Sequence, residues 1–171
     1  VTGVQTCALP ILHEQLMLAL SDAESSAGVE IGPVFLAVTG RSIKSTTGSG
    51  STVITSDSGK IGEADVQRTR TNAQAFALAP DKAVLHYADK RFVIDAEREV
   101  LNPVGQVGSK LQADVQAIYG QSNAIQTNRQ MLAEIMGYPD AGTAFSGMAA
   151  GFGAFAQPEM ERGALIVDFG A

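Results

Sequence analysis

Alternating apolar residues and sharp turn signals are concentrated in one stretch of the chain, residues 84–119, which reads VLHYADKRFVIDAEREVLNPVGQVGSKLQADVQAIY. The alternation predicts an antiparallel sheet, because successive side chains of a strand point to opposite faces. The Asn-Pro-Val-Gly sequence at residues 102–105 marks a corner between two of the strands. One side of the sheet is expected to carry Val84, His86, Phe92, Ile94, Leu111, Ala113, Val115 and Ala117.

Before this stretch the sequence predicts a helix, a strand and a second helix. Apolar residues recur at helical spacing over residues 13–26, and Gly28 follows as a stop signal. Residues 34–38, VFLAV, predict a short strand, and residues 63–76, which begin with acidic side chains, predict an amphipathic helix packed on the sheet. Three residues of this second helix are expected to face the sheet: Val66, Ala73 and Phe76.

The segment between that strand and that helix is unusual in composition. Residues 42–60 are rich in Ser, Thr and Gly, which is typical of a flexible linker, whereas Val53 and Ile54 favour a strand beside an exposed loop. Within it, residues 46–52, TTGSGST, resemble a phosphate-binding loop but lack the Gly-Lys-Ser/Thr sequence of a Walker motif. We therefore predict a plain loop there.

After the sheet, three further elements are predicted. Ser122 is a suitable N-cap for a helix over residues 122–136, which Gly137 ends. The small residues of 147–155, GMAAGFGAF, predict a tightly packed helix despite their glycines, and residues 164–170, ALIVDFG, predict a buried strand.

Charge and cysteine content exclude several classes of function. The net charge of −6 argues against a nucleic-acid-binding surface and leaves no basic patch for a membrane surface. The single cysteine, Cys7, allows neither a disulfide framework nor a cysteine-based metal site. No apolar stretch approaches the ~18 residues that a transmembrane helix needs. The chain is expected to be cytoplasmic.

The first eleven residues, VTGVQTCALPI, are identical to one reading frame of a widely used short-read sequencing adapter. We interpret residues 1–11 as a non-native, adapter-derived segment and exclude them from fold reasoning. The native chain then begins near Leu12 and comprises about 160 residues, enough for one domain-sized core. The true N-terminus, and the C-terminus as well, are expected to lie outside this sequence.

The amino-acid sequence of residues 84–119 resembles that of the inserted subdomain of FtsA, the bacterial actin homologue of cell division. Four features carry the resemblance: Leu85-His86, Ile94-Asp95, the Asn102 to Gly105 corner, and Leu111-Gln112-Ala113. It implies an α+β chain, in which part of an actin-like ATPase lobe holds an inserted SHS2-type subdomain. This subdomain has the element order strand-helix-strand-strand and an antiparallel sheet. The implied organisation is a partial lobe over 12–39, the insert over 40–120, and a return to the lobe over 121–171, cut at its second phosphate-binding strand.

The resemblance also implies a function. Intact FtsA proteins bind ATP with magnesium, polymerise, and tether the FtsZ ring to the inner face of the cell membrane at the division site. The insert is expected to contact neighbouring FtsA protomers and later division proteins, whereas FtsZ and the membrane are expected to be bound by regions outside this sequence. No nucleic-acid partner is expected.

The resemblance places two nucleotide-site residues at the end of the chain. Asp168 and Gly170 match the start of the second phosphate-binding hairpin of actin-like ATPases, where an aspartate holds hydrated magnesium and glycines admit phosphate to the backbone. Phe169 and Ala171 depart from the usual Val-Asp-Ile-Gly-Gly-Gly sequence. These residues are expected to act in the intact protein only, so this chain is predicted not to be an enzyme and to bind no cofactor alone.

Other interpretations remain open. Residues 168–170 also spell the Asp-Phe-Gly triplet of protein kinases, but no His-Arg-Asp loop precedes it. His86 has no catalytic partner placed by the sequence and is taken as structural. A pilus-assembly actin homologue of the PilM type shares the inserted architecture and is the nearest alternative. A metabolic kinase or chaperone ATPase of the actin superfamily is weaker, because those proteins lack the insert.

Overall fold

The computed structural model describes residues 5–32, 34–137 and 142–167. It separates into two compact units: residues 39–122 form one, and the described residues before and after them form the other. Each unit contains helices and strands, so the predicted α+β class is confirmed. The first of these units is called the inserted unit below and the second the outer unit.

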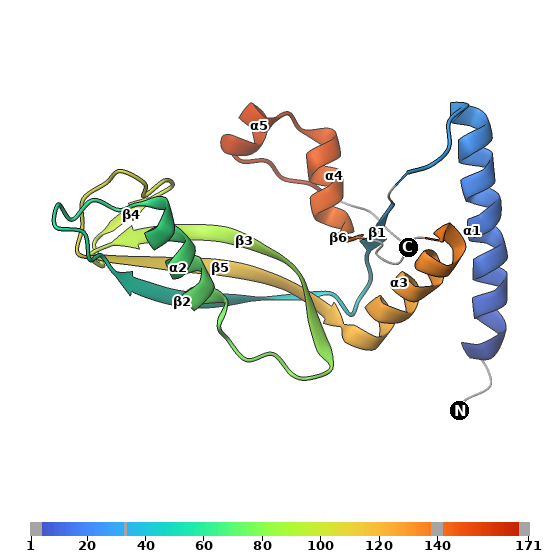
Figure 1. Ribbon diagram of the computed structural model, residues 1–171, viewed down its shortest axis with the longest axis horizontal. Helices are drawn as coiled ribbons and strands as arrows, with labels where there is room; N and C mark the ends of the chain where they lie inside the picture. Colours follow the sequence, from blue (N-terminus) through green and yellow to red (C-terminus); the bar gives the residue numbers. More distant parts are fainter. Residues whose placement is uncertain (1–4, 33, 138–141, 168–171) are drawn as a thin grey trace. The chain divides into compact units, whose positions relative to one another are not determined.

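The inserted unit is a four-stranded antiparallel sheet with one helix on it (Figure 1). The strands lie in the order β2-β5-β3-β4, so the two longest strands, β3 and β5, form the centre and β2 and β4 form the edges. The elements of the unit are β2 (Lys44–Val53), α2 (Glu63–Gln74), β3 (Lys82–Ile94), β4 (Arg98–Val100) and β5 (Lys110–Gln121).

The core of the inserted unit lies between α2 and the sheet face that α2 covers. Val66 and Ala73 of α2 are buried there, as predicted. Thr69 is also fully buried, and it is tolerated because its Oγ1 donates a hydrogen bond to the Asp65 carbonyl at 2.7 Å. The sheet contributes residues that are nearly inaccessible to solvent: Phe92, Ile94, Leu111, Ala113 and Val115.

The predicted face is correct for seven of its eight residues and wrong for His86. Ala117 is buried together with the core residues of β5. β3 has a bulge between Val84 and His86, so that His86 pairs with Ile118 and faces the side of the sheet opposite Ala117. An extra residue in one strand inverts the alternation beyond it. Val84 is only half-buried.

The prediction of a plain loop over residues 46–52 was wrong, since these residues are the middle of β2 and pair continuously with β5. Their glycines have a packing role. A Cβ on Gly48 would lie 2.2 Å from the Ala73 carbonyl oxygen, and a Cβ on Gly50 would lie 2.2 Å from the Ala73 nitrogen. Helix α2 rests directly on the backbone of this edge strand, which only glycine permits.

The outer unit contains the remaining elements, and a parallel pair of short strands, β1 and β6, joins its two sequence-distant parts. α3 has the predicted bounds, and α4 forms in the predicted small-residue segment, but α4 buries none of its residues and is not tightly packed. The elements are α1 (Gln5–Ala27), β1 (Phe35–Val38), α3 (Ser122–Met136), β6 (Gly142–Phe145), α4 (Ser146–Ala154) and α5 (Gln157–Glu161).

Two further predictions for the outer unit were wrong. Helix α1 begins at Gln5 rather than near residue 13, and Pro10 does not interrupt it. Most residues around Pro10 are apolar helix formers, which the exclusion of 1–11 left out of account. The described part of the last predicted strand, residues 164–167, is not a strand, because no described strand pairs with it, and Leu165 is 84% exposed. The adapter origin of residues 1–11 stays a prediction.

Candidate interaction surface of the inserted unit

The Asn-Pro-Val-Gly corner is a structural feature of the inserted unit. The Asn102 side chain accepts a hydrogen bond from the Val104 N–H at 3.0 Å, and Pro103 is fully buried. Gly105 adopts φ +82°, and its N–H donates to the Ile61 carbonyl at 2.9 Å. The corner therefore fixes the loop before α2 against the loop before β5, which explains why it needs Asn, Pro and Gly in this order.

Asp95 holds the turn between β3 and β4 against the start of β5. Its Oδ1 accepts hydrogen bonds from the Ser109 and Lys110 N–H groups, both at 2.8 Å. Its backbone adopts φ 52°, a left-handed conformation that Asp tolerates better than most residues. The Asp95 carboxylate of the Ile94-Asp95 pair thus stabilises a turn of the fold and is not placed as a catalytic group.

The sheet face opposite α2 is open and polar. Because β2, β3 and β5 are in antiparallel register, the side chains of Ser49, Arg91 and Asp114 project from this face side by side. Glu99 of β4 joins them, since it pairs with Val93, the next residue of β3 on the same face as Arg91. We call these four residues the Asp114 cluster.

Hydrogen bonds and ion pairs connect the whole Asp114 cluster. The Ser49 hydroxyl donates to one Asp114 oxygen at 2.6 Å, and Arg91 Nε donates to the other at 2.5 Å. Arg91 Nη1 lies 3.7 Å from a Glu99 oxygen. Asp114 is 5% exposed, whereas the Arg91 and Glu99 side chains are 46% and 65% exposed. The cluster therefore presents an arginine and a glutamate to solvent above a buried carboxylate.

The cluster shifts the protonation of its members in opposite directions. Hydrogen bonds from Ser49 and Arg91 lower the pKa of Asp114, and they outweigh the burial that acts against its charge. The hydrogen bond and charge of Asp114 raise the pKa of the Arg91 guanidinium. Both groups are charged at neutral pH and are held by partners, so they suit recognition of a polar protein surface better than proton transfer.

Sequence reasoning missed this cluster. The apolar residues of β5 were predicted from their alternation, but Asp114, which alternates with them, was not singled out. A carboxylate in the middle of an alternating strand was the available signal, because such a group must be paired when it is buried. Its partners were not predictable, since Arg91 reaches the same face only after a second bulge in β3, between Asp89 and Arg91.

The helix side of the sheet carries a second ion pair. Arg70 of α2 binds both oxygens of Asp89, with Nη2 at 2.6 Å from Oδ2, and its guanidinium carbon lies 5.5 Å from the centre of the Phe92 ring. Phe76 and Tyr87 meet edge to face, with ring centres 6.5 Å apart. These contacts fasten the C-terminal half of α2 to β3.

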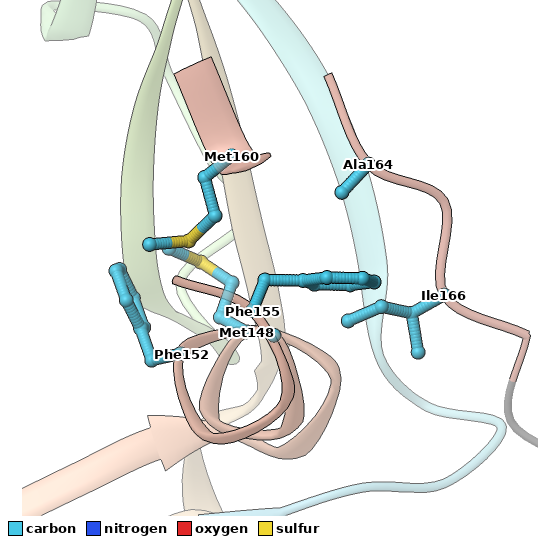
Figure 2. A pocket seen from close by; sticks show the side chains of 7 residues that line it. Met148, Phe152, Phe155, Met160, Ala164 and Ile166 are labelled. Atoms are coloured by element: carbon cyan, nitrogen blue, oxygen red, sulfur yellow. The ribbon is translucent and has the colours of Figure 1, made fainter. Parts of the chain in front are cut away.

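The predicted nucleotide residues Asp168 and Gly170 lie outside the described residues. In the described part of the outer unit, Figure 2 shows Met148, Phe152, Phe155 and Met160 around an apolar cavity of about 230 Å³. Its lining contains no charged side chain and so offers no group for phosphate or acid–base chemistry. Over the described ranges, no group of three acidic, histidine or cysteine residues is placed to hold a metal ion. Nor is any helix there both long and apolar enough to cross a membrane.

The fold and surface define an α+β protein in which an antiparallel sheet with one covering helix is inserted between two parts of another unit. Residues 40–119 match the family model described as the SHS2 domain inserted in FtsA. The chain is thus similar to the FtsA cell-division proteins, as the sequence predicted.

Comparison with characterised proteins extends the similarity beyond the insert. The chain is 26% identical over 152 residues to the cell division protein FtsA of Borreliella burgdorferi, 29% to that of Neisseria meningitidis and 28% to that of Escherichia coli K12. Each match covers 89% of this chain, and 37%, 36% and 36% of the respective relative. The chain therefore spans little more than a third of the length of these relatives.

Proposed function

We propose that this chain is the central part of an FtsA-type division protein. In its complete form the protein binds ATP and magnesium, polymerises, and tethers the FtsZ ring to the inner face of the cell membrane from the cytoplasm. The observation that carries the proposal is the SHS2 match over residues 40–119, together with similarity to FtsA proteins over 89% of the chain. The relatives reported above are cell-division proteins, which favours this role over pilus assembly.

Within that protein, the inserted unit contacts neighbouring protomers and later division proteins. The open sheet face supports this role, because it presents the paired charges of Arg91 and Glu99 from a rigid sheet. Hydrogen bonding to a buried carboxylate fixes the Arg91 side chain before a partner arrives, which lowers the entropy cost of binding. A partner is thus expected to bind the charged guanidinium of Arg91 on this face.

Nucleotide binding belongs to the complete protein in this proposal. Asp168 would hold hydrated magnesium and Gly170 would admit phosphate to the backbone, in a site that needs further phosphate-binding residues from outside this sequence. The chain alone is accordingly expected to neither bind nor hydrolyse ATP.

Domain exchange tests the proposed role. The SHS2 domain of the Escherichia coli relative would be replaced by residues 40–119, and septation would be measured in cells depleted of their own FtsA. We expect the chimera to restore septation. The same chimera carrying Arg91→Glu should lose this activity, while Lys90→Glu, the same charge change at the neighbouring exposed residue, should keep it.

Two results would contradict the proposal. A stably expressed, folded chimera that behaves like a deletion of the domain would show that the insert does not perform the division role. A chimera that works equally well with Arg91→Glu would show that the open face is not the contact surface.

A further inference from the structure

The edge of the sheet formed by β2 lacks the usual protection against pairing with another chain. β2 pairs with β5 along its whole length and with no other described strand. Exposed edges are commonly blocked by charged residues, prolines or bulges. In β2 the only charged residue is Lys44 at its start, and the pairing from Lys44 to Val53 contains neither a proline nor a bulge.

A groove lies beside the C-terminal end of this edge, where α2 rests on β2. Gly48 and Gly50 bring the helix against the strand, so the outer side of α2 forms a wall next to the strand edge. The groove has a volume of about 500 Å³. It is lined by Thr52, Val53, Ala64, Gln67, Arg68, Thr71 and Asn72.

The Asn72 side chain of α2 is hydrogen-bonded to the edge of β2. Its Nδ2 donates to the Ser51 carbonyl at 2.9 Å and to Thr52 Oγ1 at 3.2 Å. A backbone carbonyl of β2 is therefore satisfied by a side chain from the helix. An N–H group of an added strand would take the place of the Asn72 amide.

The charge of the groove indicates what kind of segment it fits. Arg68 is the only charged residue of the lining, in a chain of net charge −6. It forms an ion pair with Asp65 of the preceding turn, but its side chain remains 54% exposed. A carboxylate entering the groove would meet this guanidinium and no acidic lining residue.

A second copy of the chain fits the edge less well than a single extended segment. Antiparallel pairing of two β2 edges would place both α2 helices on the same face of the joined sheet. Each helix would then face the other across the seam, so the two helices would compete for the space beside the edge. An extended segment brings no helix with it.

We propose that an extended peptide segment of a partner protein adds to β2 as a fifth strand beside α2. Its backbone pairs with the edge and displaces Asn72 from the Ser51 carbonyl, and a carboxylate side chain of the segment binds Arg68. Other proteins take peptides by strand addition in the same way, with backbone hydrogen bonds supplying affinity and neighbouring side chains supplying specificity. This site is separate from the Asp114 cluster, so its failure would leave the proposed function standing.

A library of displayed random peptides of about ten residues, the length that matches β2, would be selected on the complete 171-residue chain. Enriched peptides should contain Asp or Glu and lack proline. One of them would be synthesised and titrated by fluorescence anisotropy. Arg68→Glu should weaken its binding by about tenfold or more. Asn72→Ala should strengthen it, and Lys90→Glu, an equal charge change away from the groove, should leave it unchanged.

Circular dichroism and amide hydrogen exchange would first establish that the three variants fold like the parent chain. The opposite directions expected for Arg68→Glu and Asn72→Ala separate the proposal from a general loss of structure. It would be overturned if no peptide is enriched, or if the peptides bind the Arg68→Glu variant as tightly as the parent chain. A chain that sediments as a dimer until Arg68 or Asn72 is changed would also overturn it, in favour of self-pairing.

Discussion

Gly50→Ala should destabilise the inserted unit because helix α2 occupies the space that a side chain would need. The new Cβ would lie 2.2 Å from the Ala73 nitrogen and 2.4 Å from the Asn72 carbonyl carbon. An ordinary contact begins at 3.4 Å, so the helix backbone must retreat by about 1.2 Å (3.4 − 2.2). Overpacking of this kind costs about 1–3 kcal/mol, against a gain of about 0.5–1 kcal/mol from replacing glycine inside a strand. A net loss of about 1–2 kcal/mol is expected.

Amide hydrogen exchange followed by mass spectrometry measures this loss separately in each unit. Peptides from β2, α2 and β5 should lose protection in Gly50→Ala, while peptides of the outer unit should not change. Gly153→Ala is the matched control, because a Cβ at Gly153 meets no atom within 4 Å and alanine favours its helix. Unchanged protection in the inserted unit of Gly50→Ala would refute the close packing of α2 on β2.

Three further predictions concern the cluster, the turn and the nucleotide. Because the folded pKa of Asp114 is lowered, its charge stabilises the chain above the unfolded pKa of about 3.9, and this contribution disappears as pH falls through the folded value. Asp114→Asn should therefore lower the free energy of unfolding, measured with urea at pH 7, by about 2 kcal/mol. The variant should also lose less stability than the parent chain as the pH falls. An equal loss of stability in acid for both proteins would contradict the pairing. Asp95→Ala should cost about 2 kcal/mol in the same assay and Asp95→Asn clearly less, because asparagine keeps an acceptor and tolerates the left-handed backbone. Titration calorimetry with ATP and magnesium should give no binding to this chain, and a Kd tighter than about 1 mM would show that it holds a working nucleotide site.

The sequence predicts this fold well where the strands are regular and poorly where a strand has a bulge or an unusual composition. The buried face of β5 was predictable, because Leu111, Ala113, Val115 and Ala117 alternate through a strand without a bulge. The placement of His86 was not, since one extra residue at Leu85 inverts the alternation and no sequence signal marks the bulge. The extent of β2 was missed for a different reason. Its Ser, Thr and Gly residues are typical of loops, and the need for glycine under α2 is visible only when the helix is in place.

The candidate surface was less predictable than the fold. The family resemblance rests on residues that hold turns in place, Asp95 and the 102–105 corner, and it does not point to the open face. The Asp114 cluster joins three strands that are far apart in sequence, so its geometry depends on the register of the whole sheet. Ser49 in particular lies in residues 46–52, which were predicted to be a loop.

Sequencing genomic DNA across the codons for Ile11 and Ala171 tests the central claim most directly. If the chain is the central part of an FtsA-type protein, the reading frame should contain a phosphate-binding loop upstream of the described fold. Downstream it should contain the rest of the second phosphate motif, a second lobe and a terminal amphipathic helix. A native reading frame that encodes residues 1–11 and holds none of these elements would contradict the account and identify a free-standing binding module.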